Sequence, residues 1–597
     1  MSMFFGVMIA TQMFANTFNY SQTLGHNFNG LYAPWAIFSW YVKWGGMYQM
    51  HFIQAGSYGL IVTAVLLLII VVVNQVRTNS SNQNDSLHGS ARWAERTDIQ
   101  AAGLLAPKNS WFKKHERSGD YVYVGAWEDN NGRIYYLKHN GAEHVLCYAP
   151  TRSGKGVGLV IPTLLSWGQS AVITDLKGEL WSLTAGWRQQ YAHNKVIRFE
   201  PAAQNGSACW NPLDEIRLDS GYEVGDVQNL ATLIVDPDGR GLNDHWQKTA
   251  QSLLVGLILH VLYKAKNEFT TATLASVDDL LTDPDNDIGG VWAAMVSYPH
   301  RNGEPHPVVM ACARDMADRP PEEAGSVLSS VKSYLSLYRD PAVNKNIGSS
   351  DFRIRDLMNF DTPVSLYIVT NPNDKARLRP LIRILLNMIV RLLADKVEYN
   401  NGKPVQNFKH RLLLMLDEFP SLGKLEILQE SLAFLAGYGI KAYLICQDIN
   451  QLKSREIGYG HDESITSNCH IQNAYAPNRI ETAEHLSKLT GQATVIKEQI
   501  TTSGSRMGMM HKNVTRTIQE TQRALMTPDE CMRMPGAKKN ERGEIVEAGD
   551  MIIYVAGYPA IYGKQPLYFI DEEFTARAAL PTPKQSDRTV EKIANFS

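Results

Sequence analysis

A long uncharged segment near the N-terminus restricts the fold of this chain more than any other feature. Residues 52–76 contain no Asp, Glu, Lys or Arg and end in the run "GLIVTAVLLLIIVVVNQV". A helix that crosses a bilayer needs about 20 apolar residues, so this segment is long enough to do so. A buried helix of a soluble core is the alternative, but such a helix would carry a polar stripe. We therefore predict a transmembrane helix here.

Basic residues are unevenly distributed around this segment. Lys43 precedes it, whereas Arg77, Arg92 and Arg96 follow it, which predicts that the C-terminal bulk of the chain is cytoplasmic. We predict a shorter first span at "MSMFFGVMIATQMFA", which lacks the basic start of a cleaved signal peptide; a segment at the membrane interface is the alternative. Residues 1–76 would then form a two-helix membrane anchor, with the Trp- and Tyr-rich stretch between the spans on the outer face.

The size, charge and cysteines of the chain limit what it can be. With 597 residues it is too long for one hydrophobic core, so several domains are expected. Its formal net charge of −2 argues against a broad basic face for nucleic acid, so any such contact must be local, as inside a pore. No C-x-x-C pair is present, and we expect reduced thiols rather than a metal site or disulfides. The cysteines are Cys147, Cys209, Cys312, Cys446, Cys469 and Cys531.

Short apolar runs recur after the anchor and predict an α/β fold. They are "HVLCY", "SAVITD", "KVIRFE", "TPVSLYIVTN", "RLLLMLDE", "IKAYLICQD", "HIQNAYAP" and "DMIIYVAG". Several lack alternation, as in strands buried on both faces of a mainly parallel sheet, and helical stretches separate them. The segment "YVYVGAWEDNNGRIYYLKHN" predicts a β-hairpin around D-N-N-G. Residues 219–350 lack strong strand runs and predict an all-α insertion, which leaves 77–218 and 351–597 to form the sheet domain.

The segment "CYAPTRSGKGVGLVIP" is typical of a phosphate-binding loop between a strand and a helix. Lys155 would reach the β- and γ-phosphates of a nucleotide, and Gly154 and Gly156 would let the backbone approach them. The predicted nucleotide-binding residues are Pro150, Thr151, Arg152, Ser153, Gly154, Lys155, Gly156 and Val157.

This loop departs from the usual pattern G-x-x-x-x-G-K-[ST] at two positions. Ala149 stands where the first glycine is usual, and Gly156 stands where a hydroxyl usually holds magnesium. Alanine tolerates most loop conformations except positive φ, so we expect a negative φ at Ala149. Pro162 falls late in the predicted helix and is expected to kink or cap it.

Polar residues follow two other predicted strands and complete a site for phosphoryl transfer. Asp417, at the end of "RLLLML", can hold Mg²⁺, and Glu418 beside it can orient and deprotonate a water molecule. Gln447 ends "IKAYLIC" and can sense the γ-phosphate at the carboxyl edge of the sheet. Taken alone, such a carboxylate pair or glutamine is more often part of a turn, and the combination with the loop makes the prediction specific.

A positive residue that would stabilise the transition state is not evident, and a neighbouring subunit of a ring could supply it. Asp175, Lys177 and Glu179 in "DLKGELW" also follow a strand, but the residues alone indicate no role for them. The candidates for the missing cation are Lys424, Arg455 and Arg479.

Several motifs resemble the VirD4/TraG family of type IV secretion coupling proteins, which are membrane-anchored relatives of the FtsK/HerA translocases. They are "GSARWA", "APTRSGKGVGLVIPTLL", "DLKGELW", "LDEFPSLGKLEILQESLAFLAGYGIK" and "CQDINQL", in the family's order. The resemblance covers residues 25–569, and Gly156 after the lysine is usual in the family, whereas Ala149 is not.

The resemblance implies two transmembrane helices, a RecA-like ATPase domain with an inserted all-α domain, and a homo-hexamer in the bacterial inner membrane. It implies ATP and Mg²⁺ as cofactors. It also implies two kinds of cargo, a relaxase bound to single-stranded DNA or secreted effector proteins, and inner-membrane components of a type IV secretion system as partners.

Two other functions stay open from the sequence. An FtsK-type double-stranded DNA translocase would need a C-terminal DNA-reading module, for which the segment after "PLYFIDEEF" leaves no room. A substrate receptor that binds nucleotide without turnover would not need the carboxylate pair Asp417–Glu418. The all-α insertion is the expected selector of cargo.

Overall fold

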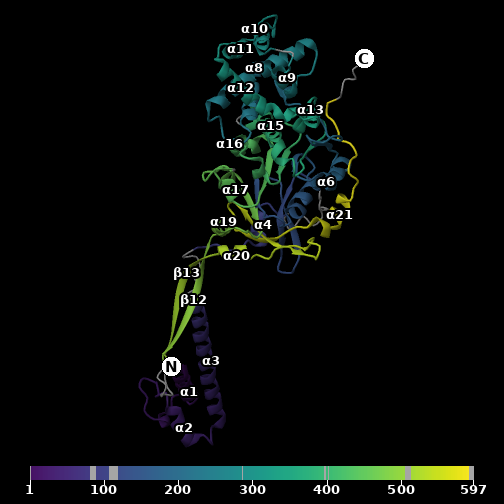
Figure 1. Cartoon of the computed structure of the whole chain (residues 1–597). Coiled ribbons are helices and arrows are strands. Elements are labelled where there is room, and N and C mark those ends of the chain that lie inside the picture. The colour runs from purple at the N-terminus through teal and green to yellow at the C-terminus, as the bar shows by residue number, and fades with distance from the viewer. Residues whose placement is uncertain are drawn as a thin grey trace. The chain divides into compact units, whose positions relative to one another are not determined.

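The computed structural model describes residues 2–80, 89–105, 119–284, 287–395, 398–400, 403–405, 407–456, 458–503 and 513–590. The chain divides into two compact units (Figure 1). The smaller comprises Met1–Ser90 and Thr494–Gln522, and the larger comprises Ala91–Ala493 and Arg523–Ser597. Nothing in the sequence predicts that residues 494–522 belong with the N-terminal segment.

Three helices form the N-terminal part of the smaller unit. They are α1 (Ser2–Thr17), α2 (Ala36–Trp44) and α3 (Gln49–Ser80). Within the described residues, Gln49–Val73 is the one helical segment that is long and apolar enough to cross a membrane, and it contains most of the predicted span. Helix α1 has 16 residues, fewer than the about 20 that a spanning helix needs, so the first span is not confirmed.

Helices α1 and α3 approach each other closely through small residues. A Cβ atom at Gly6 would lie 2.6 Å from the Gly59 carbonyl oxygen, and one at Gly59 would lie 3.0 Å from the Ala10 Cβ. Phe14 stacks on Phe52 at a centroid distance of 3.9 Å and closes the contact. Small residues that let two backbones approach are typical of helix pairs in membranes.

An 11-stranded sheet forms the centre of the larger unit, in the order β2-β1-β17-β16-β11-β3-β10-β9-β4-β6-β5. The strands from β11 to β5 in this order are parallel, and β2, β1, β17 and β16 extend the sheet by antiparallel pairing. All the predicted apolar runs are strands of this sheet, and the D-N-N-G hairpin is β1–β2. The strands are β1 (Val122–Glu128), β2 (Ile134–His139), β3 (Val145–Tyr148), β4 (Ser170–Asp175), β5 (Lys195–Phe199), β6 (Val364–Val369), β9 (Leu412–Leu416), β10 (Ile440–Cys446), β11 (Ile471–Ala474), β16 (Asp550–Val555) and β17 (Ile561–Lys564).

Helices occupy the interval 219–350, and its described residues contain no strand. They are α7 (Glu223–Val235), α8 (His245–Glu268), α9 (Leu274–Thr282), α10 (Ile288–Ser297), α11 (Pro307–Ala317), α12 (Pro321–Leu335) and α13 (Pro341–Ile347), and Figure 1 shows α8 to α12 gathered at one end of the larger unit. Their apolar side chains belong to one continuous core with strand residues such as Leu146 and Val172. The domain boundaries at 218 and 351 therefore stay a prediction.

Shorter elements connect and cover the sheet. The helices are α4 (Arg96–Ala101), α5 (Ile161–Leu164), α6 (Glu179–Gln190), α14 (Asp356–Asn359), α15 (Lys375–Leu393), α16 (Glu426–Leu435), α17 (Asn450–Lys453), α18 (Ile465–Asn468), α19 (Ile480–Thr490), α20 (Pro528–Met532) and α21 (Glu572–Ala578). Two short hairpins are β7 (Glu398–Asn400) with β8 (Lys403–Val405) and β14 (Lys538–Lys539) with β15 (Ile545–Glu547). A longer hairpin, β12 (Gln492–Ser503) with β13 (Asn513–Ala524), belongs mostly to the smaller unit.

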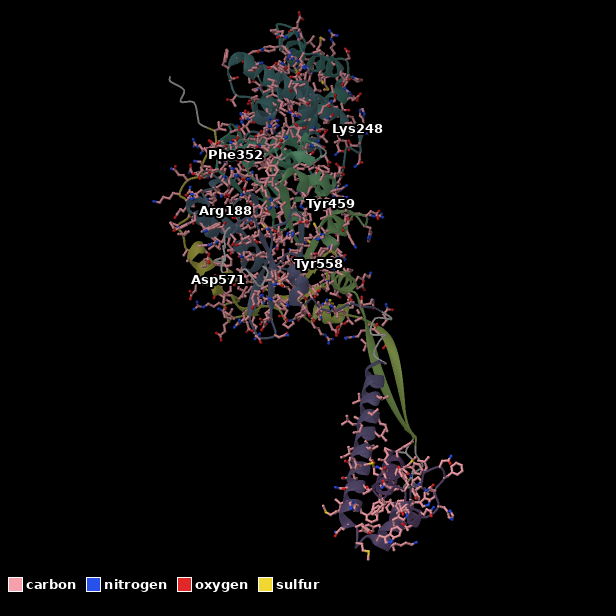
Figure 2. All side chains as sticks on the ribbon, turned by 180° about the vertical axis from the view of Figure 1, so that it is seen from behind. Arg188, Lys248, Phe352, Tyr459, Tyr558 and Asp571 are labelled. Carbon is pink, nitrogen blue, oxygen red and sulfur yellow. The ribbon has the colours of Figure 1, made fainter. Side chains whose placement is uncertain are left out.

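A buried arginine joins the elements around α6. Arg188 (Figure 2) is fully buried, and its guanidinium donates to the carbonyl oxygens of Leu164 at 3.1 Å and Trp167 at 2.6 Å. It also donates to the side chains of Ser365 and Asn194, at 2.7 and 2.9 Å. Burial lowers the pKa of Arg188 to about 10, so the guanidinium remains charged at neutral pH. This residue fixes the end of α5 against α6 and the start of β6.

Candidate active site

The predicted loop connects β3 to a helix, as the sequence indicates. Its first residue continues the sheet, since the Ala149 N–H donates to the Cys446 carbonyl oxygen at 2.8 Å. Ala149 has a negative φ, as predicted, and the left-handed positions are Arg152 (φ 62°) and Gly154 (φ 89°). The alanine therefore causes no backbone strain in this loop.

Pro162 shapes the helix that follows the loop. The turn Gly156–Val160 is π-helical, and α5 begins directly after it with Pro162 in its first turn. Proline has no N–H for the Gly158 carbonyl, and the Ile161 N–H instead bonds to the Gly156 carbonyl, five residues back. The predicted kink is this widened turn.

Lys155 lies against the carboxylate pair that follows β9. Its Nζ is 2.7 Å from Asp417 Oδ1 and 3.4 Å from Glu418 Oε1. Glu418 has φ 52°, in the left-handed region that non-glycine residues rarely adopt. Such strain is typical of functional sites, where the surroundings hold a residue in a conformation it would otherwise avoid.

Two further residues hold the Glu418 carboxylate. Gln447 Nε2, directly after β10, donates to Glu418 Oε1 at 3.2 Å, so the predicted glutamine belongs to this cluster. Lys375, the first residue of α15, has its Nζ 3.5 Å from Glu418 Oε2. Lys375 is not among the predicted site residues, although its position shortly after β6 puts it at the same carboxyl edge of the sheet.

The charges in this cluster favour the ionised forms of Glu418 and Lys155. Burial opposes ionisation of Glu418, but Lys155, the Gln447 hydrogen bond and Lys375 outweigh it, so the pKa of Glu418 is below its usual value. Burial also opposes the charge on Lys155, but Asp417 and Glu418 outweigh it and raise the pKa of the ammonium. The site therefore contains a charged lysine and a carboxylate that stays deprotonated at neutral pH.

Two buried oxygens in the site have no hydrogen-bond partner among the described residues. They are Asp417 Oδ1, whose contact with Lys155 is an ion pair, and Ser153 Oγ in the loop. The backbone of Asp417 is held in place, because Thr174 Oγ1 donates to its carbonyl oxygen at 3.2 Å. Buried polar atoms are almost always satisfied, so the unpartnered Ser153 Oγ fits a site that binds an anion, whereas Asp417 Oδ1 is satisfied by Lys155 and would hold a metal ion only once the lysine moves away.

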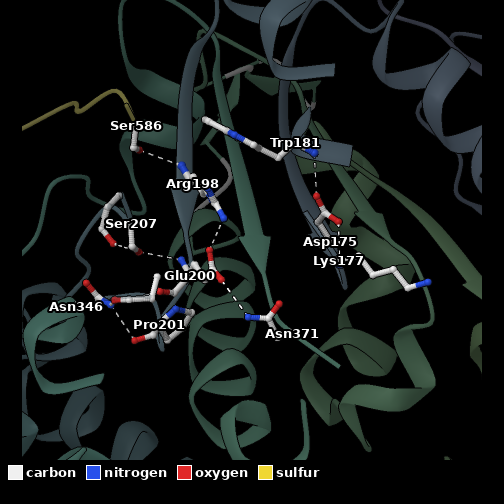
Figure 3. A network of polar contacts seen from close by, with 12 residues as sticks. Asp175, Lys177, Trp181, Arg198, Glu200, Pro201, Ser207, Asn346, Asn371 and Ser586 are labelled. Carbon is white, nitrogen blue, oxygen red and sulfur yellow. Dashed lines mark hydrogen bonds and ion pairs between the residues drawn. The ribbon is translucent and has the colours of Figure 1, made fainter. Parts of the chain in front are cut away.

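The aspartate of "DLKGELW" stabilises the turn that follows β4 (Figure 3). The Asp175 carboxylate accepts from the backbone N–H groups of Trp181 at 2.8 Å and Lys177 at 3.3 Å. Burial raises the pKa of Asp175, and the backbone N–H groups oppose this rise. The aspartate thus fixes the turn from β4 into α6, which gives the motif the role that the sequence alone did not indicate.

The three candidate cations do not reach the carboxylates within the described part of one chain. Lys424 pairs with Glu426 at 2.8 Å, and Arg455 and Arg479 are exposed. None of them forms an ion pair with Asp417 or Glu418 in the segments described above.

The fold and site define a class of protein, an α/β protein with a large, mainly parallel sheet and a glycine-rich loop at the carboxyl edge of that sheet. The family model "Type IV secretory system Conjugative DNA transfer" matches residues 92–592, and the chain belongs to this family. The predicted resemblance to the VirD4/TraG coupling proteins is thereby confirmed.

Individual relatives agree with this assignment. The chain is 66% identical to the conjugal transfer protein TraG of Escherichia coli, over 98% of this chain and 93% of that protein. It is 28% identical to the protein VirD4 of Agrobacterium fabrum (strain C58 / ATCC 33970), over 92% of this chain and 75% of that protein.

Solved structures show the same fold. The unbound bacterial conjugative coupling protein TrwB superposes with a TM-score of 0.51 at 19% identity, over 78% of this chain and 92% of that chain. The plasmid coupling protein TrwB in complex with the ATP analogue ADPNP superposes with a TM-score of 0.52 at 18% identity, over 80% of this chain and 93% of that chain. The predicted α/β class with a large, mainly parallel sheet is confirmed.

Proposed function

We propose that this chain is a membrane-anchored ATPase that couples cargo to a type IV secretion channel and drives its transfer by ATP hydrolysis. One observation carries the proposal: Lys155 lies close to Asp417 and Glu418, although they follow two strands far apart in sequence. The lysine Nζ is 2.7 Å from the Asp417 carboxylate and 3.4 Å from the Glu418 carboxylate. Family membership gives the cellular process, and the site gives the chemistry.

The loop residues 150–157 would hold the phosphates of ATP. Lys155 would exchange its ion pair with Asp417 for phosphate oxygens, which releases the aspartate to hold Mg²⁺. Lys155 is the one ion-pair partner of Asp417 Oδ1 in the described part of the chain, so departure of the lysine would leave this oxygen free to accept a metal ion. A bound Mg²⁺ supplies positive charge to the phosphate oxygens as the terminal phosphoryl group leaves. The related TrwB has been solved with an ATP analogue, which supports nucleotide as the ligand.

Glu418 would orient the attacking water and accept its proton. Because its pKa is below the usual value, the carboxylate is ready to accept a hydrogen bond from water at neutral pH. Gln447 and Lys375 hold this carboxylate and would orient it toward the terminal phosphate. Lys424, Arg455 and Arg479 remain candidates for a cation that a neighbouring subunit of a homo-hexamer inserts.

The anchor and the cargo complete the proposal. Helix α3 would cross the bacterial inner membrane, with α1 as a short second span packed on it through Gly6 and Gly59. The larger unit would be cytoplasmic. The helical insertion at 219–350 would select the cargo, a relaxase bound to single-stranded DNA or an effector protein, and inner-membrane components of the secretion system would receive it.

Phosphate release by the purified full-length chain tests the proposal. We expect ATP- and Mg²⁺-dependent release from the unaltered protein, and losses of about 100-fold or more in Lys155→Ala and in Glu418→Gln. Lys409→Ala is the matched control, since Lys409 is exposed and pairs with Asp361 on the surface. Equal rates in all four proteins would refute the ATPase, and nucleotide binding without release would favour a receptor that does not turn over.

A further inference from the structure

A glutamine from the far end of the chain lies directly behind the phosphate-binding loop. Gln565 follows β17 and is 3% exposed. Its Nε2 donates to the carbonyl oxygens of Ser153 at 3.1 Å and Gly154 at 2.9 Å. Both hydrogens of the amide group are thus directed at the backbone of the loop.

The other polar atoms of Gln565 are also engaged. Its Oε1 accepts from the Gly549 N–H at 3.4 Å, and its own N–H donates to the Gly549 carbonyl oxygen at 2.9 Å. With the oxygen held by a donor and the nitrogen by two acceptors, only one orientation of the amide satisfies every partner. The side chain is therefore a fixed brace and not an adaptable surface group.

The glycines of the loop make room for this brace. A Cβ atom at Gly158 would lie 2.7 Å from Gln565 Cγ, and one at Gly154 would meet the Gln565 amide and lie 2.6 Å from Ile545 Cδ1. Gly154 also has φ 89°, so glycine is required there both for conformation and for space. The loop and the glutamine fit each other closely over several atoms.

Peptide geometry links this contact to phosphate binding. In a trans peptide the C=O and N–H groups are coplanar and point in opposite directions. The Ser153 carbonyl shares its peptide with the Gly154 N–H, and the Gly154 carbonyl shares its peptide with the Lys155 N–H. Because Gln565 holds both oxygens on its own side, both N–H groups must face away from it.

We propose that Gln565 is a positioning residue that orients the Gly154 and Lys155 N–H groups toward the phosphate oxygens of the nucleotide. Without it, the peptides on the two sides of Gly154 lose these hydrogen bonds. The Gly154 carbonyl oxygen keeps one from the Gly158 N–H at 2.9 Å, but the Ser153–Gly154 peptide can rotate, because glycine has no steric preference that would hold it. Phosphate binding would then include the entropic cost of ordering these peptides. This inference rests on the proposed function, since it requires that the loop binds a nucleotide.

The test replaces the amide without changing its size. Gln565→Glu keeps the shape but has no donor at neutral pH and places a carboxylate against two carbonyl oxygens. Gln565→Met keeps the volume, has no donor and adds no charge. In the full-length protein we expect each variant to weaken binding of a fluorescent ATP analogue by about tenfold or more, and to raise KM for ATP more than it lowers kcat.

Gln472→Glu is the matched control, because Gln472 is also buried and bonds to Tyr148, Thr466 and His485. A melting temperature for every variant separates loss of folding from loss of positioning. The inference is overturned if the unaltered chain binds the analogue and both Gln565 variants bind it equally well, or if Gln472→Glu weakens binding as much. An unaltered chain that binds no analogue would overturn the proposed function, and this inference with it.

Discussion

Two lysines, one in the loop after β3 and one on the adjacent parallel strand β10, differ in their surroundings and in the direction of their pKa shifts. Lys155, beyond the carboxyl end of β3, contacts two carboxylates and has a raised pKa. Lys441, near the amino end of β10, is 0% exposed, and its amine contacts His139 Nδ1 at 2.7 Å and the carbonyl oxygens of Glu143 at 2.7 Å and Gly141 at 2.9 Å.

Burial, followed by the charge of Arg411, lowers the pKa of Lys441 to about 7, and Glu143 only partly opposes this. The contrast shows how one sheet gives a residue type two roles. A lysine surrounded by carboxylates keeps its charge available for an anion that can replace them. A lysine surrounded by neutral acceptors loses charge and serves as a structural crosslink. The predictions below test this division.

Replacement of Lys155 should have the largest effect on function. We expect Lys155→Met to lower ATPase activity by about 100-fold or more. The variant should also lose the increase in melting temperature that bound Mg·ATP gives the unaltered chain. Thermal unfolding with and without Mg·ATP measures this rise. Lys441→Met should retain this increase in melting temperature. If both variants lose the increase, the proposed difference between the two lysines is wrong.

Truncation of Lys441 should mainly reduce stability. Lys441→Ala leaves His139 Nδ1 and the Glu143 carbonyl without their buried donor, and each such group costs about 1 to 3 kcal/mol. The Gly141 carbonyl keeps its bond from the Arg411 guanidinium at 3.0 Å. We expect a fall of roughly 2 to 4 kcal/mol in the free energy of unfolding, with ATPase activity per folded molecule unchanged. Denaturant unfolding of the full-length chain and active-site titration would measure the two quantities. A loss of activity without a loss of stability would contradict the structural role.

The pH dependence of stability should report Lys441. Its pKa is about 7 in the folded chain against 10.5 when unperturbed, so the unfolded chain binds more protons between these values. Raising the pH through this window therefore favours the folded state, by up to about 1.4 kcal/mol per pH unit. Melting temperatures at pH 7 and pH 9 should rise less, or fall more, in Lys441→Met than in the unaltered chain. Equal changes in melting temperature in both proteins would show that Lys441 does not cause the pH dependence of stability.

Lys375 should have the smallest effect. It is one of several groups that hold Glu418, at 3.5 Å, and is partly exposed. We expect Lys375→Ala to lower kcat by about threefold to tenfold with little change in KM, and Lys375→Arg to restore most of the loss. Steady-state phosphate release measures both constants. A rise in KM alone would assign Lys375 to nucleotide binding instead of to Glu418.

Much of the larger unit is predictable because its signals are local. Strands such as β9 and β10 are buried on both faces, and their uninterrupted apolar runs show this directly. Lys155, Asp417, Glu418 and Gln447 each follow such a run, and parallel strands bring their carboxyl ends to one edge. The structure places these residues together, and their catalytic roles stay a prediction.

Other features depend on contacts between distant segments and have no local signal. Gln565 acts on the loop only because β17 and β16 extend the sheet on the side of β3 where β11 lies. Helix α1 is apolar and has 16 residues, and helices of this length and composition occur both at a membrane interface and within a membrane. The local sequence therefore indicates neither the contact of Gln565 with the loop nor the location of α1.

The chain passes between its two units after Ser90, after Ala493 and after Gln522. A fragment made by starting translation at residue 91 would therefore keep residues 494–522 but lose the rest of their unit. Thr494 would lose the Gly89 carbonyl, to which its N–H and Oγ1 donate at 3.2 and 3.1 Å. Isolation of the larger unit alone would therefore need two deletions, and a protease that cuts once near residue 90 would leave residues 494–522 attached to it.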